Sequence, residues 1–136
     1  MIYNLAQYLK TNFPSETIYV NQKHKVLTDS NIDDRIVVLT DSAGGLQPKT
    51  GWARARVQVY ARDVDNVVSK ELITELYNPI KDSNGLTLPT VTVNSIVYPA
   101  ITTGQIIADQ TPAQINIDDQ DRPEWVFNLT IQYTEV

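Results

Sequence analysis

The stretch from Ala53 to Arg62 constrains the fold more than any other part of the sequence. It reads Ala-Arg-Ala-Arg-Val-Gln-Val-Tyr-Ala-Arg, and successive side chains of a β-strand point to opposite faces of the sheet. One face would be small and apolar, and the other long and basic. The apolar face comprises Ala53, Ala55, Val57, Val59 and Ala61, and the basic face comprises Arg54, Arg56, Gln58, Tyr60 and Arg62. We expect a central strand whose apolar face forms the floor of the core.

Two helices are expected around this strand. Apolar residues at helical spacing over 2–13 predict an N-terminal helix that ends at Pro14. The helix-start residues 63–66 introduce a second helix, which Pro79 ends. Its expected apolar face comprises Val64, Val67, Val68, Leu72, Leu76 and Tyr77.

Four further segments have the composition of strands: 17–20, 35–40, a hairpin of 90–93 with 96–98, and 124–134. The continuous apolar run 35–40 should be covered on both faces. In the last strand, Trp125, Phe127 and Leu129 should face the helices, opposite the small residues of the central strand. We interpret 102–122 as a polar connection. The prediction is one α+β domain over 1–136, with a single antiparallel-rich sheet of four to five strands and two helices mainly on one face.

Composition limits the class of protein. The chain has 136 residues, no cysteine and a formal net charge of −5, which suits one globular domain. Without cysteine it has no disulfides, no thiol chemistry and none of the usual zinc sites. The acidic excess argues against broad binding to nucleic acid. We recognise no signal sequence and no apolar segment of the roughly 20 residues that span a membrane, so we expect a cytoplasmic protein.

The sequence offers no convincing catalytic, cofactor or metal site. His24 is the only histidine, and no serine lies in a nucleophile motif. The loop 44–51 lacks the glycine that a phosphate-binding loop has before its lysine. Asp118, Asp119 and Asp121 are dense in carboxylate, but the spacing of a calcium-binding EF-hand loop fails, and a solvated turn is the simpler interpretation. We therefore predict that the chain is not an enzyme.

The order of three segments resembles a known family. A glycine-rich loop leads into Trp52–Arg62 and then a helix, and the acidic segment Asp118–Leu129 leads into the C-terminal strand. This order resembles the minor capsid and tail terminator proteins of tailed bacteriophages, small proteins of the head-to-tail junction. The spacing of Arg56, Gln58 and Arg62 carries most of the resemblance. Where the family pattern has a glycine in the acidic turn, this chain has Asp121.

The resemblance implies a subunit that forms a ring, usually of six copies, on the head-proximal end of the tail tube. There it would stop tube polymerisation and present a surface to the head. Its partners would be copies of itself, the tail tube protein and the head connector protein, with DNA only as cargo and no membrane. It would occur in the host cytoplasm during assembly and then in the virion. Such a task needs no cofactor.

A head-to-tail ring joins two different patches of one subunit, and this chain offers one basic and one acidic patch. Arginine pairs well with carboxylates, in the same subunit or in a neighbour. The expected interface residues are Arg54, Arg56, Gln58, Tyr60, Arg62, Asp118, Asp119 and Asp121. The expected docking loop for the tube or connector comprises Gly44, Gly45, Leu46, Gln47 and Lys49.

Two alternatives stay open from the sequence. Another head-to-tail connector or a tail tube subunit would share the ring-forming fold. A nucleic-acid-binding module would instead use Arg54, Arg56, Tyr60 and Arg62 as a basic and aromatic strand face.

Overall fold

The computed structural model describes residues 1–21, 35–43, 52–81, 83–118 and 121–135. Within these residues the chain forms two helices and nine strands. The helices are α1 (Ile2–Asn12) and α3 (Asn66–Tyr77). The strands are β1 (Ile18–Val20), β2 (Ile36–Ala43), β3 (Ala53–Arg62), β4 (Thr87–Leu88), β5 (Val91–Val93), β6 (Ile96–Tyr98), β7 (Ile101–Ala108), β8 (Ala113–Ile117) and β9 (Pro123–Glu135). The predicted α+β class is confirmed.

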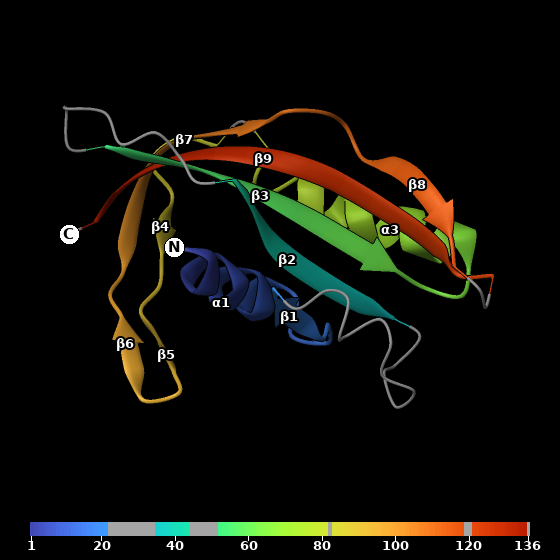
Figure 1. Cartoon of the computed structure of the whole chain (residues 1–136), viewed down its shortest axis with the longest axis horizontal. Coiled ribbons are helices and arrows are strands. Elements are labelled where there is room, and N and C mark those ends of the chain that lie inside the picture. The colour runs from blue at the N-terminus through green and yellow to red at the C-terminus, as the bar shows by residue number, and fades with distance from the viewer. Residues whose placement is uncertain (22–34, 44–51, 82, 119–120, 136) are drawn as a thin grey trace.

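Seven of the nine described strands form one sheet, and β5 and β6 form a separate hairpin, so the predicted number of four to five strands in the sheet was too small. The order is β1-β2-β3-β9-β7-β4, and β8 also pairs with β9. Only β1 and β2 are parallel; the other pairs of this sheet are antiparallel. Figure 1 shows β3 and β9 side by side along the length of the molecule, both strongly curved. The sheet is therefore organised around these two strands.

The apolar face of β3 lies in the core over its second half, whereas Ala53 and Ala55 of the predicted face are only partly buried. Val57, Val59 and Ala61 are fully buried in one cluster with residues of both helices, so α1 and α3 pack on the same face. Trp125, at the start of β9, belongs to the same cluster. It lies beside Ala61 in register, not opposite it, because β3 and β9 are neighbours in one sheet. The small residue leaves room for the indole next to it, rather than across a layer.

Strand β2 is hidden on both faces, as its continuous apolar run predicts. Val37 and Leu39 belong to the main core under the helices. Ile36 and Val38 point the other way and form a smaller cluster with Tyr60 and other residues of that face. The face of the sheet away from the helices is therefore shielded from solvent where β2 pairs with the second half of β3.

Helix α3 begins at Asn66, two residues after Val64, the first member of its predicted apolar face. The side chain of Asp65 caps it by accepting hydrogen bonds from the backbone N–H groups of residues 67 and 68. The buried stripe runs through Leu72, Ile73 and Leu76. At about 100° per residue, position 67 falls on the opposite side of the helix. Val64 and Val67 are accordingly exposed, and the prediction that they face the core was wrong.

The segment 102–122 is not an irregular connection, and this prediction was also wrong. It contains most of β7 and all of β8, which pair with successive halves of β9. A bulge between Thr103 and Ile106 interrupts the regular pairing in β7. All five residues of β8 are exposed. The bulge breaks the alternation of apolar and polar residues in β7. Strand β8 does alternate, from Ala113 to Ile117, but it is short and exposed on both faces.

The β5–β6 hairpin projects from the body of the protein (Figure 1). Its turn residues Asn94 and Ser95 have positive φ values of 50° and 67°, as expected for a tight hairpin turn. The buried side-chain amide of Asn4 in α1 donates to backbone carbonyls at both ends of the hairpin segment. The ring of Tyr3 also packs on Tyr98, with 4.9 Å between centroids. Helix α1 therefore anchors the hairpin.

Candidate functional site

The basic face of β3 divides into an exposed half and a buried half. Arg54 and Arg56 are exposed, and Gln58 is half-buried. Tyr60 and Arg62 are 0% and 1% exposed. The pattern predicted from strand alternation is present, but its last two members are buried: Tyr60 lies in the cluster around β2, and Arg62 lies beside Asp118 of the turn after β8. Only the first half of this face is accessible to a partner.

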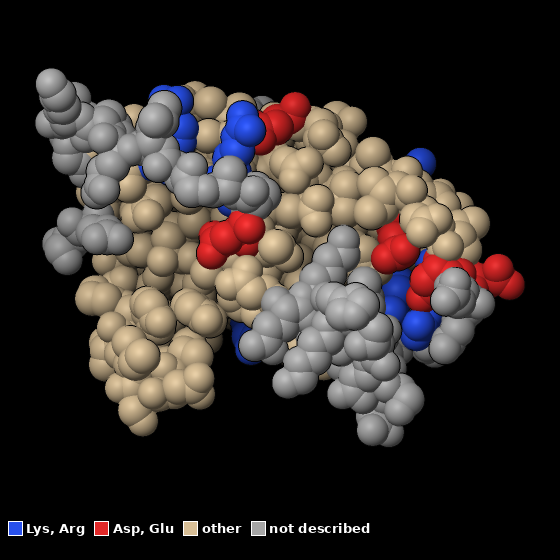
Figure 2. Space-filling view, in the orientation of Figure 1, with Lys and Arg blue, Asp and Glu red and all other residues tan. Residues whose placement is uncertain are grey.

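The buried half is held by internal pairs. The hydroxyl of Tyr60 donates a hydrogen bond to Glu124 of β9. Asp118, just after β8, lies 2.7 Å from the Nε of Arg122 and 3.6 Å from a terminal nitrogen of Arg62. The backbone N–H of Arg122 also donates to Asp118 at 2.9 Å. At the end of the molecule where β3 and β8 end, Figure 2 shows acidic and basic atoms in contact. These contacts join β3 to β9 and to the turn after β8 within one chain.

Burial changes the proton affinity of two of these groups. Burial raises the pKa of Tyr60, and the hydrogen bond to Glu124 and the charge of Glu124 raise it further. The phenol therefore stays a hydrogen-bond donor. Burial lowers the pKa of Arg62, and the charge of Arg122 acts in the same direction, whereas Asp118 opposes it. One carboxylate between two guanidinium groups offsets part of the cost of burying them.

The three aspartates of the acidic turn, Asp118, Asp119 and Asp121, differ in their surroundings. Asp118 pairs with Arg62 and Arg122 of its own chain, which is one of the two arrangements that the sequence left open. Asp121 is exposed, and its φ of 59° places it in the left-handed region. Aspartate tolerates that region better than most residues, so it can occupy the position at which the resembling family has glycine. Asp119 lies outside the described residues.

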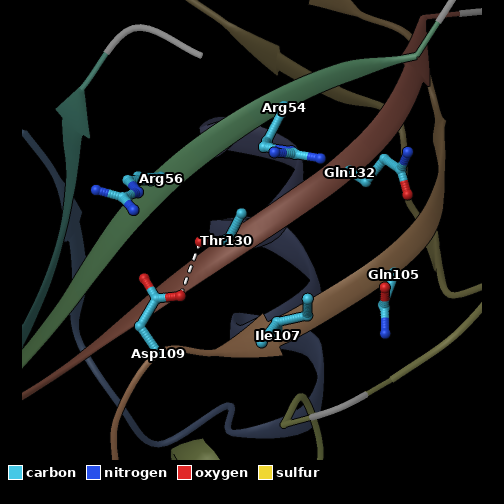
Figure 3. A pocket seen from close by; sticks show the side chains of 7 residues that line it. All are labelled: Arg54, Arg56, Gln105, Ile107, Asp109, Thr130 and Gln132. Carbon is cyan, nitrogen blue, oxygen red and sulfur yellow. Dashed lines mark hydrogen bonds between the residues drawn. The ribbon is translucent and has the colours of Figure 1, made fainter. Parts of the chain in front are cut away.

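The exposed half of the basic face borders a shallow pocket of about 260 Å³. Figure 3 shows its seven side chains, which come from β3, β9 and β7 and the residue after β7. Arg56, Thr130 and Ile107 form one row across the three strands, and Arg54 lies beside Gln132 in the next. The lining residues are Arg54, Arg56, Gln105, Ile107, Asp109, Thr130 and Gln132.

The two arginines of this pocket have no partner among the described residues. No hydrogen bond or ion pair joins Arg54 or Arg56 to another described side chain. The carboxylate in the pocket, Asp109, instead accepts a hydrogen bond of 2.8 Å from the Thr130 hydroxyl. Two guanidinium forks two residues apart on one strand offer donors to carboxylates or other anions. The pocket is therefore suited to an acidic surface.

Trp52 marks the upstream end of this face. A Cβ atom placed on Gly104 of β7 would come within 2.8 Å of the Trp52 ring, so glycine permits the ring to lie on the strand.

The sequence predicted Arg54 and Arg56 as site residues but missed Gln105, Ile107 and Asp109, because β7 was not predicted. The β-branched run around Ile107 was the available signal.

Other predicted features lie outside the described residues. These include His24 and the docking loop Gly44, Gly45, Leu46, Gln47 and Lys49. Among the residues that the structure describes, no cluster of three or more acidic, histidine or cysteine side chains is suited to a metal ion. Within the same ranges, neither helix has the length and apolar character needed to cross a bilayer.

Comparison with known proteins gives no family for this chain. No family model matches the sequence, and no curated protein matches it.

Proposed function

We propose that this chain is a structural protein of a tailed bacteriophage that forms a ring at the head-proximal end of the tail tube. The ring would stop tube polymerisation and provide the surface that joins the tail to the head. The proposal rests on the resemblance of Trp52–Arg62 and Asp118–Leu129 to the tail terminator family. A compact α+β subunit with an open basic sheet face is compatible with it.

The observation that carries the proposal is that Arg54 and Arg56 have no partner among the described residues. Neighbouring charges on the same sheet are paired inside the chain, as Arg62 and Arg122 are with Asp118. The first two arginines instead are exposed beside a pocket with polar walls. Arginine is enriched at protein interfaces because its planar fork pairs with carboxylates. A surface for another protein subunit explains this arrangement.

The mechanism would be occupancy of a growing end. A tail tube grows because each ring offers a surface to the next. A subunit that binds that surface without reproducing it ends growth, and its other surface is then available to the head connector. This mechanism needs complementary surfaces and no reacting group.

The burial of Tyr60 and Arg62 weighs against the nucleic-acid alternative. That function was expected to use four residues of β3, and two of them are buried. The net charge of −5 also opposes contact with phosphates beyond the local pair Arg54 and Arg56. A single exposed arginine pair is a small electrostatic footprint for nucleic acid.

Immunogold electron microscopy would test the proposed location. Phage particles would carry this chain with a short epitope at its C-terminus and be stained with gold-labelled antibody. We expect gold at the junction of head and tail. Gold along the whole tail would instead identify a tube subunit, and particles without gold would overturn the proposal.

A variant would test the role of the basic face in the same particles. Reversing both charges with Arg54→Glu and Arg56→Glu should prevent the joining of heads and tails. Lys10→Glu is the matched control, because Lys10 is exposed on α1, away from the pocket. Normal joining by the double variant would show that this face is not used.

A further inference from the structure

The outer side of α3 carries an acidic pair that the fold leaves uncompensated. Glu71 and Glu75 are exposed and one helical turn apart, and Val67 lies one turn earlier and is 66% exposed. Like charges four residues apart weaken an isolated helix. No described side chain forms a hydrogen bond or ion pair with either glutamate. The face therefore has a cost to stability that a partner could offset.

Most other carboxylates in the described part of the chain already have a role. Asp63 accepts from the backbone N–H of Asp65, Asp65 caps α3, and Asp109 accepts from Thr130. Glu16 pairs with Arg35, Asp118 with Arg62 and Arg122, and Glu124 with Tyr60. Asp41 and Asp121 are exposed but stand singly. Among described residues, Glu71 and Glu75 are thus the exposed pair one turn apart on one element.

The spacing of this acidic pair matches the spacing of the basic pair. Two residues along a strand advance by about 6.6 Å, which separates Arg54 from Arg56. Four residues along a helix advance by about 6 Å, which separates Glu71 from Glu75. Arginine and glutamate side chains are long enough to absorb the difference, so both carboxylates can meet guanidinium groups at once.

An apolar contact fits the same geometry. Ile107 is 42% exposed and lies in register with Arg56, two strands away, or about 9.6 Å across the sheet. Val67 lies about 12 Å from Glu75 along α3. A helix that crosses the three strands obliquely would therefore place Val67 on Ile107 while Glu75 reaches the arginines. This contact would add burial of apolar surface to the ion pairs.

We infer that the pocket at Arg54 and Arg56 binds the outer face of α3, with Glu71 and Glu75, from a second copy of this chain. The inference rests on the proposed ring and names its subunit contact. Helix α3 packs on one face of the sheet, and the arginines project from the other. The contact therefore joins two different patches head to tail, which is the type of interface from which rings are built.

Charge exchange between the two patches tests the pairing. Self-association would be measured by analytical ultracentrifugation over a range of concentrations, with Lys10→Glu as control. We expect the variant R54E/R56E and the variant E71R/E75R each to weaken association about tenfold or more, because like charges then face each other. The variant with all four changes should recover association to within about threefold of the original chain. Urea unfolding of each variant would verify that it folds.

Cysteine cross-linking tests the apolar contact independently. The chain has no cysteine, so Val67→Cys in one copy and Ile107→Cys in another supply the only thiols. Each variant oxidised alone measures the disulfides between like copies, and the designed pair is the additional dimer formed in the mixture. Mixing the two variants under oxidising conditions should give a disulfide-linked dimer. Ile115→Cys is the matched control, because Ile115 is 51% exposed on β8, and its mixture with Val67→Cys should give none.

The possible results separate this inference from the proposed function. If the quadruple variant associates no better than the two double variants, the inferred contact is wrong. It is also wrong if the original chain stays monomeric and the mixed cysteine variants give no cross-link. If gold labelling still marks the junction of head and tail, the proposed function stands and the subunits meet elsewhere. If charge exchange succeeds but gold is absent from the junction, the contact stands and the proposed location is wrong.

Discussion

Replacement of Asn4 would release the β5–β6 hairpin from helix α1. The Asn4 side chain is fully buried, and its amide nitrogen lies 2.9, 3.2 and 2.9 Å from the carbonyl oxygens of Pro89, Tyr98 and Pro99. Its two N–H groups thus serve three acceptors. Each hydrogen bond contributes about 1 kcal/mol net, and a buried acceptor left without a donor costs more. We expect Asn4→Ala to lower the free energy of unfolding by about 2–3 kcal/mol.

Asn4→Asp is the more informative change, because it keeps the shape and replaces the donor with a carboxylate oxygen. At pH 7 that oxygen would face three carbonyl oxygens, so we expect a loss larger than that of Asn4→Ala, about 3–5 kcal/mol. Burial would raise the pKa of the introduced carboxyl above its usual value of about 3.9. A raised acid pKa lowers stability progressively as the pH rises from the unfolded pKa to the folded pKa, and the cost is complete above the folded pKa. The deficit of Asn4→Asp should therefore shrink as the pH falls from 7 to 4.

Urea unfolding of both variants and the original chain at several pH values would measure these effects. Hydrogen exchange of the amides in 91–98 would show whether the hairpin loosens before the rest of the fold. The reasoning would be refuted if Asn4→Ala cost less than about 0.5 kcal/mol, well below one buried hydrogen bond. It would also be refuted if Asn4→Asp and Asn4→Ala had the same stability at pH 7.

Two further predictions concern the buried half of the basic face. Asp118→Ala should lower the free energy of unfolding, measured in urea, by about 3 kcal/mol, because Arg62 and Arg122 lose the carboxylate between them. Asp118→Asn should lower it less, since asparagine keeps an acceptor for the backbone N–H of Arg122. The pKa of Tyr60 is raised in the fold. Above about pH 10 the unfolded chain therefore releases a proton that the folded chain keeps. The free energy of unfolding should then fall by about 1.4 kcal/mol per pH unit. Tyr60→Phe removes this contribution, so its stability difference from the original chain should narrow between pH 10 and 11; a constant difference would contradict the assignment.

Regular alternation made the centre of the fold predictable. The two-residue period of β3 and β9 and the apolar run of β2 predicted which side chains meet the core, because the apolar residues of each face recur regularly. Prediction failed where the pairing of a strand is interrupted, where a strand is exposed on both faces, and where a helix begins outside the core. In β7 a bulge interrupts the pairing after Thr103, and β8 buries none of its residues. In α3 the first turn lies outside the core, so Val67 is exposed although its chemistry is that of a core residue.

The candidate site was predictable in the same partial way. Alternation placed Arg54 and Arg62 on one face of β3. It could not show that Arg54 is exposed while Arg62 is buried, because Arg62 lies beside Asp118, a residue far along the chain. The pocket wall from β7 was also missed, since strand order is a property of the tertiary fold. Residue chemistry along one strand thus indicated a basic face, and long-range pairing decided how much of it is open.

The central position of β9 has a consequence for how the chain folds. Strands β3, β7 and β8 all pair with β9, and all three precede it in the sequence. During synthesis, the middle of the sheet must therefore wait for the strand that is made after its neighbours. Contacts between residues distant in sequence form slowly, and until β9 docks, β3 presents an unpaired edge to other nascent chains. We expect the full chain to refold slowly, and a chain without residues 123–135 to aggregate strongly. Removal of the tip of the β5–β6 hairpin should change neither the refolding rate nor the tendency to aggregate.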